Sequence, residues 1–256
     1  MNKILFIGQC KQGSNSLHKL ICDQPGFEPG KDIRAMVRSH TNNQDYFDNW
    51  TQEEIQSAKY LVDKSIVNPD KYDYHVGDWK NYNHKMVFMF RNIYNVLKSQ
   101  FLVVLAGEES YQYNIPKFGK KWIVDDNFSE KDVAEIMDYN KQKYTNYYNL
   151  THLPKDVFDF NKNVFFCTFE DFINDTHNQF DRLEDFLDIK LNSREYPRLN
   201  STRFEWYAGQ TSTYERNLKL FEKYKDFIYE TWIKKEEYEK LSELTGIDLI
   251  GLYNIK

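Results

Sequence analysis

The chain has 256 residues, of which 41% are hydrophobic and 29% are charged, and its formal net charge is −5. This balance is typical of a globular protein with a sizeable core, and it excludes collagen-like, disulfide-scaffold and largely disordered chains. A protein that binds double-stranded nucleic acid usually carries a basic surplus, so we expect no nucleic-acid partner. A local basic pocket for a small anion is compatible with the net charge.

The cysteines and the first residues bear on metal binding and on the compartment. Cys10, Cys22 and Cys167 are scattered, and no CxxC pair or helix-spaced histidine pair accompanies them, so we expect no metal site. Scattered thiols favour a reducing compartment. The apolar run before Gly8 is too short for a signal peptide, and no stretch reaches the roughly 20 apolar residues of a membrane span. The sequence therefore predicts a cytoplasmic protein without a membrane span.

Hydrophobic periodicity predicts alternating strands and helices in the first part of the chain. Strands are expected at residues 4–7, 32–37 and 85–90, and helices around 17–21, over 51–62 and from residue 96 onward. The second of these helices is expected because Thr51 and Glu54 have the spacing of a capping box. The first strand, its polar loop and the helix after it resemble the start of a βαβ unit.

The second part of the chain begins with a polar, tyrosine-rich segment at 108–150, with helical patterning near 130–144. We interpret this segment either as a lid or acceptor-facing insertion or as an ordinary helical layer. A buried strand is expected at 163–169, then a helix that buries Phe180, Leu183, Phe186 and Leu187, a loop at 192–213, and a charged helix with Trp232, Tyr238 and Leu241.

Strands separated by helices favour an α/β fold with a parallel sheet. No repeat, low-complexity tract or Pro/Gly linker divides the chain, so residues 1–256 are expected to form a single domain. The prediction is a P-loop-like three-layer fold with a central parallel β-sheet flanked by helices.

The loop after the first strand has the composition of a phosphate-binding loop. Backbone N–H groups at a helix N-terminus attract anions, and Gly13 allows the chain to approach a phosphate closely. Ser14, Asn15 and Ser16 add short donors, and Lys11 adds a positive charge. A Walker A loop places its Lys directly after the second Gly, where this chain has Ser14. The spacing therefore disfavours a nucleoside triphosphatase. The alternative to a phosphate-binding loop is an ordinary polar turn between strand and helix.

A second anion-binding candidate follows the strand at 85–90. Arg91 comes at the carboxyl end of that strand, the edge where parallel α/β sheets bind ligands. Ser99 comes two helical turns later, and a guanidinium with a hydroxyl suits a phosphate monoester. The alternative is an arginine that caps the sheet or pairs with an acid.

Together these segments resemble the sulfotransferases that use 3′-phosphoadenosine-5′-phosphosulfate (PAPS). The loop at 10–17 resembles Pro-Lys-x-Gly-Thr-Thr-x-Leu, and Arg91, Asn92 and Ser99 match the family's Arg-Asn-Pro-x-x-x-x-x-Ser. Residues 164–171 resemble its strand and Tyr-Glu-Asp motif, and residues 241–248 resemble its closing Leu-Gly-x-Asp turn. The departures are Cys10 for Pro, Asn15 for Thr and Ile93 for the Pro after Arg-Asn.

The resemblance implies roles for residues along the chain. The residues implied for the 5′-phosphosulfate are Lys11, Gly13, Ser14, Asn15 and Ser16, and those for the 3′-phosphate are Arg91 and Ser99, with Arg203 as a further candidate or a surface residue. Lys11 would stabilise the charge that develops on the leaving phosphate, without a metal. The product would be adenosine 3′,5′-bisphosphate.

The general base that takes the acceptor proton has two candidates. His40 in Arg-Ser-His is similar to the Lys-Thr-His that supplies the base in cytosolic members, and histidine titrates near neutral pH. A surface histidine is the alternative, and Asp45 is the fallback base. His152 stands in a similar motif, but it follows Arg91, which is the wrong chain order.

The leading hypothesis is a sulfotransferase that moves a sulfuryl group to a hydroxyl or amine of a glycan or small molecule. A catalytically inactive PAPS-binding protein of the same fold is the second hypothesis. A small-molecule kinase is the third, although the chain lacks a Walker-type Lys. The motifs leave the acceptor and the oligomeric state open.

Overall fold

The structure is a computed structural model, and it describes residues 2–8, 16–17, 20–21, 35–39, 60–65, 83–110, 127–138, 162–192, 194–195 and 211–256. The chain divides into two compact units. The first contains Met1–Arg91 and Asn146–Leu199, and the second contains Asn92–Thr145 and Asn200–Lys256. The expected single domain with an insertion at 108–150 stays a prediction.

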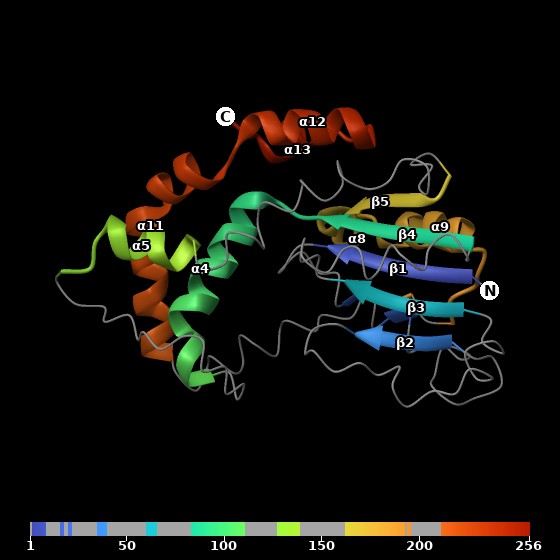
Figure 1. The fold of residues 1–256 in the computed structure, drawn as a ribbon, viewed down its shortest axis with the longest axis horizontal. Coiled ribbons are helices and arrows are strands. Elements are labelled where there is room, and N and C mark those ends of the chain that lie inside the picture. Colours follow the sequence, from blue (N-terminus) through green and yellow to red (C-terminus); the bar gives the residue numbers. More distant parts are fainter. Residues whose placement is uncertain are drawn as a thin grey trace. The chain divides into compact units, whose positions relative to one another are not determined.

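The first unit is built on a five-stranded sheet in which every pairing is parallel. Its strands are β1 (Asn2–Gly8), β2 (Ala35–Ser39), β3 (Tyr60–Ser65), β4 (Asn83–Phe90) and β5 (Val164–Thr168). Their order in the sheet is β2-β3-β1-β4-β5, and all five arrows point the same way in Figure 1. The predicted α/β class with a central parallel sheet is confirmed.

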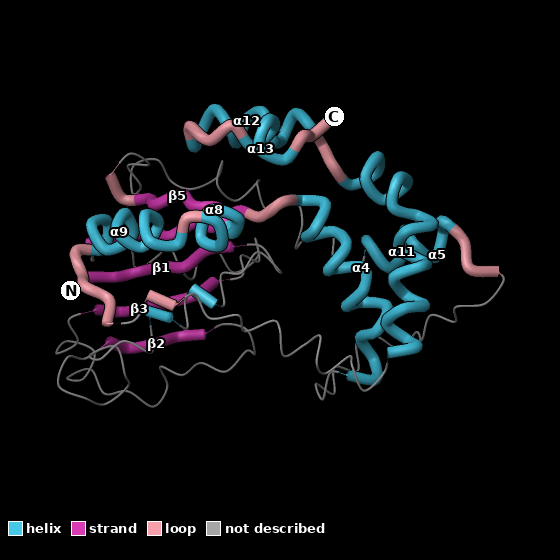
Figure 2. The backbone as a smooth tube through the Cα atoms, turned by 180° about the vertical axis from the view of Figure 1, so that it is seen from behind, coloured by secondary structure: helices cyan, strands magenta, loops and turns pink. Residues whose placement is uncertain are grey.

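Both faces of β4 are buried, as is typical of a strand inside a parallel sheet. One face packs against α8 (Phe169–Asn174) and α9 (Thr176–Leu187), which lie across the sheet in Figure 2. The side chains of this core come from alternate strand positions and from the helices: Ile4, Phe6, Leu17, Leu20, Ile21, Val87, Met89, Phe165, Cys167, Phe172, Phe180, Leu183, Leu187 and Leu191. On the opposite face, Met86, Phe88 and Phe90 are buried as well.

The strands expected at 4–7, 32–37, 85–90 and 163–169 are confirmed as β1, β2, β4 and β5, with shifted ends. The helix expected over 51–62 is wrong at its end, because Tyr60, Leu61 and Val62 belong to β3. These residues pair with β1 on one side and β2 on the other. The pairing of β3 with both neighbours outweighs the local capping signal. Aromatic and β-branched residues such as Tyr60 and Val62 also favour strands. The earlier part of that helix lies outside the described residues.

The second unit is helical. It contains α4 (Ile93–Ser110), α5 (Glu130–Asp138), α11 (Thr211–Trp232), α12 (Lys235–Thr245) and α13 (Leu249–Tyr253). The helix from residue 96 onward is confirmed as α4, and the helix near 130–144 is confirmed over Glu130–Asp138 as α5, while 139–144 lie outside the described residues. Helices α4 and α11 run antiparallel, since the ring centroids of Tyr94 and Tyr229 lie 4.7 Å apart and those of Phe101 and Phe221 lie 5.8 Å apart.

Two expectations for the end of the chain need correction. The loop at 192–213 was expected to be irregular throughout, but α11 already begins at Thr211. The single charged helix is two helices, because Lys234 has extended backbone between α11 and α12. No Gly or Pro marks this break in the sequence. Helix α12 buries Tyr238 and Leu241, and it packs on α13.

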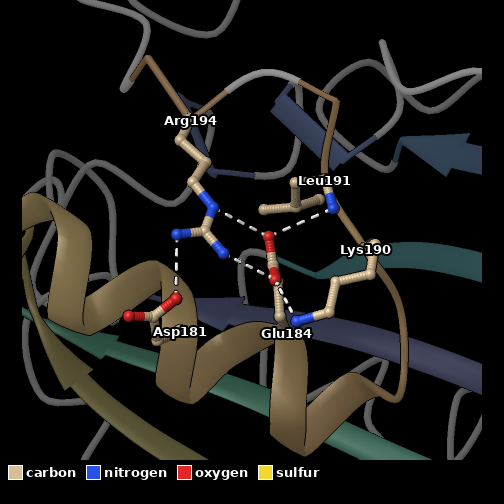
Figure 3. A network of polar contacts seen from close by, with 5 residues as sticks. All are labelled: Asp181, Glu184, Lys190, Leu191 and Arg194. Carbon is tan, nitrogen blue, oxygen red and sulfur yellow. Dashed lines mark hydrogen bonds and ion pairs between the residues drawn. The ribbon is translucent and has the colours of Figure 1, made fainter.

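The buried carboxylate of Glu184, on α9, binds the segment that follows this helix. Glu184 is 1% exposed, and its oxygens accept hydrogen bonds from Lys190 Nζ at 2.8 Å, Leu191 N at 3.1 Å and Arg194 Nε and Nη2 at 2.9 and 2.7 Å (Figure 3). Arg194 also reaches Asp181 at 2.8 Å. Burial opposes ionisation of Glu184, but these hydrogen bonds outweigh it and lower the pKa of the carboxyl to about 2.

Candidate functional site

The strand order puts the topological switch point of the sheet between β1 and β4. From β1 the chain runs to β2 on one side, and from β4 it runs to β5 on the other, while β1 and β4 are neighbours. In open α/β sheets, ligands bind where neighbouring strands send their connections in opposite directions. Gly8 at the end of β1 is the register partner of Met89, two residues before Arg91. The loop after β1 and Arg91 therefore begin at the same edge of the sheet.

The helix after the loop is placed by its apolar side chains. Leu17 and Ile21 are fully buried in the core beneath the sheet. Ser16, in the same helical segment, is 3% exposed. Ser16 is thus a buried polar residue in the helical segment after β1. Backbone N–H groups at the N-terminus of a helix favour an anion. The other expected loop ligands, Lys11, Gly13, Ser14 and Asn15, lie outside the described residues.

Arg91 lies at the carboxyl edge of β4, as expected, and it is partly buried. Its guanidinium carbon lies 4.6 Å from the centroid of the Phe169 ring. Phe169 directly follows β5, and the preceding residue, Thr168, is the register partner of Phe90. The arginine and the ring are thus neighbours because adjacent parallel strands end at the same level.

The residue after Arg91 is used for local structure. Asn92 Oδ1 accepts a hydrogen bond from Tyr94 N at 3.0 Å, which makes Asn92 the N-cap of α4. Ile93 is then the first helical residue, and it is 2% exposed. Proline is favoured at this first helical position because an N–H there has no partner within the helix, so its absence costs nothing. The isoleucine in place of the family's proline keeps the helix start and adds a buried side chain.

Ser99 lies on α4, partly buried, in the second unit. Its sharing of an anion with Arg91 stays a prediction. His40, Asp45 and Arg203 lie outside the described residues, although β2 ends at Ser39, the residue before His40. Among the residues that the structure describes, no group of His, Cys, Asp and Glu side chains is assembled like a metal site. No described helix is long and apolar enough to cross a bilayer.

The two remaining motif matches have clear local roles. Thr168 caps α8 by accepting a hydrogen bond from Asp171 N at 3.0 Å, so the Phe-Glu-Asp segment forms the first turn of that helix. Gly246 ends α12 with a φ of 71°, and Asp248 caps α13 by accepting from Gly251 N at 2.8 Å. The sequence reasoning did not single out Phe169 as a site residue. The sequence places Phe169 directly after a buried strand, but only the sheet order makes that strand the neighbour of β4 and brings the ring beside Arg91.

Comparisons with known proteins find likeness in structure alone. No family model and no curated protein matches the sequence. Mouse sulfotransferase SULT7A1 complexed with PAP is 15% identical with a TM-score of 0.45, over 75% of this chain and 60% of the mouse chain. A sulfotransferase from Alicyclobacillus acidocaldarius is 14% identical with a TM-score of 0.46, over 87% of this chain and 96% of that one. At TM-scores this low neither likeness carries weight, and the function is inferred from the chain's own residues.

Proposed function

We propose that the protein is a PAPS-dependent sulfotransferase that acts on a hydroxyl or amine of a glycan or small molecule. The observation that carries this proposal is the meeting of β1 and β4 at the switch point of the sheet. It brings the origin of a phosphate-type loop and the position of Arg91 to one edge. The motif resemblance implies that the ligand of this two-part anion site is a nucleotide with phosphate groups at two positions.

The donor set fits such a nucleotide. The buried Ser16 lies in the helical segment after β1, and the guanidinium of Arg91 lies against the Phe169 ring at the end of β4. A serine hydroxyl donates to phosphate oxygens, and a guanidinium binds a phosphate monoester through two parallel N–H bonds. The residues that would hold the 5′-phosphosulfate are Lys11, Gly13, Ser14, Asn15 and Ser16, and those for the 3′-phosphate are Arg91, Ser99 and Arg203.

PAPS supplies an activated sulfuryl group when it is bound. The ammonium of Lys11 lowers the barrier by stabilising the negative charge that grows on the leaving phosphate oxygen. A neutral ring nitrogen of His40 accepts the proton from the acceptor, with Asp45 as the alternative base. The scattered cysteines fit a cytoplasmic location. The catalytically inactive binder is the second candidate, because His40 only resembles the family's base motif and Asp45 is a fallback.

The proposal is tested by incubating the protein with PAPS and a panel of phenols, alcohols and glycans, and by measuring release of adenosine 3′,5′-bisphosphate. We expect acceptor-dependent release, reduced about 100-fold or more in Lys11→Met. The matched control is Lys225→Met, which removes an exposed lysine paired with Glu222 on α11. Bisphosphate binding without turnover of any acceptor would favour the inactive binder. Binding of ATP with magnesium alone would favour the kinase.

A further inference from the structure

The position of Phe169 under Arg91 has a consequence for ligand selection. The ring is itself held in place, because Thr168 caps α8 through Asp171 N and because Phe169 packs against the core of the first unit. The ring therefore offers a fixed surface at the carboxyl edge of the sheet. An arginine side chain has many rotamers, and stacking on a fixed ring restricts them.

Contact with an aromatic ring and hydrogen bonding to an anion use different parts of a guanidinium. A guanidinium attracts a ring through its face, whereas it binds phosphate or carboxylate through N–H groups at its edge. The ring contact and the anion hydrogen bonds are thus compatible, and the ring contact orients the guanidinium before the anion binds. A pre-oriented donor loses less entropy on binding, so its contribution to affinity is larger.

We propose that Phe169 is a positioning residue that orients Arg91 and thereby gives the site its preference for nucleotides with a 3′-phosphate monoester. This inference rests on the proposed function, in which Arg91 contacts that phosphate. Phe169 acts through the arginine. Removal of the ring should therefore weaken the binding only of nucleotides whose 3′-phosphate contacts Arg91.

The test is calorimetric titration with adenosine 3′,5′-bisphosphate and with adenosine 5′-phosphate, which lacks the distinguishing group. In Phe169→Leu we expect the affinity ratio between the two nucleotides to fall about three- to tenfold, as for the loss of one cation–π contact. Phe169→Tyr keeps the ring and restores the ratio. Phe169→Met, with similar bulk, is a second ring-free variant in case the leucine variant does not fold.

Two controls separate positioning from general damage. In an Arg91→Ala background, Phe169→Leu should change the ratio no further. Phe165→Leu removes a ring that lies 5.2 Å from the guanidinium carbon of Arg182, elsewhere on β5, and it should leave the ratio unchanged. An unaltered ratio in both ring-free variants would overturn this inference alone. A wild-type protein with no preference for the bisphosphate would overturn the proposed function and this inference together.

Discussion

Gly8 and Met89 are register partners on the neighbouring parallel strands β1 and β4. The two strands are far apart in sequence, and each is followed by a candidate anion-binding segment. Because their connections leave in opposite directions, the pairing marks the switch point of the sheet. In the proposed function, two motifs that are each weak alone are parts of one site.

The first prediction concerns the general base. We expect His40→Ala to lower kcat by about 100-fold or more without changing the affinity for adenosine 3′,5′-bisphosphate. A histidine base must be neutral, so wild-type activity should fall in acid, and this acid limb should vanish in the variant. Steady-state kinetics from pH 5 to 9 measure both, with His177→Ala on the exposed side of α9 as the control. A matching loss in Asp45→Asn instead would assign the base to the aspartate.

The second prediction concerns the buried carboxylate of Glu184. Its pKa is lowered from 4.5 to about 2, which corresponds to about 3 kcal/mol of stability at neutral pH. The ionised carboxylate contributes its full share of the free energy of unfolding above pH 4.5, and this contribution is lost as the pH falls toward 2. Glu184→Gln should therefore lower the free energy of unfolding at pH 7 and flatten its decline in acid. Denaturant unfolding at several pH values measures this.

The partners of Glu184 provide a graded comparison. Lys190 is 79% exposed and donates one hydrogen bond, so Lys190→Ala should lower the free energy of unfolding only slightly. Arg194 is 32% exposed and donates two to the same carboxylate, so Arg194→Ala should cost more. Equal losses in both variants would contradict the assigned network.

The third prediction concerns Gly246 at the end of α12. Its φ of 71° lies in the left-handed region, and a Cβ built there would meet no atom of the described residues within 4 Å. Gly246→Ala should therefore cost about 1 kcal/mol from backbone strain alone, and Gly246→Asn should cost less. Thermal unfolding of the two variants measures the difference. A larger loss in the asparagine variant would show that space limits this position.

Continuous apolar runs were enough to predict most strands, because a strand buried on both faces admits few polar residues. Residues 60–62 were misassigned because their state depends on pairing with Asn2–Ile4 and with β2, which no local pattern records. For the site, Arg91 was predictable from its place after a buried strand. Its contact with Phe169 depends on which strands are neighbours, so it could be found only from the sheet order.

The most direct test of the central claim is titration of the protein with adenosine 3′,5′-bisphosphate, beside Arg91→Ala and the matched control Arg182→Ala. Arg182 also stacks on a phenylalanine, Phe165, but it lies on α9 away from the carboxyl edge. We predict metal-independent binding by the wild type and by Arg182→Ala, and a loss of about tenfold or more in Arg91→Ala. Equal binding by all three proteins, or no binding by any, would contradict the account.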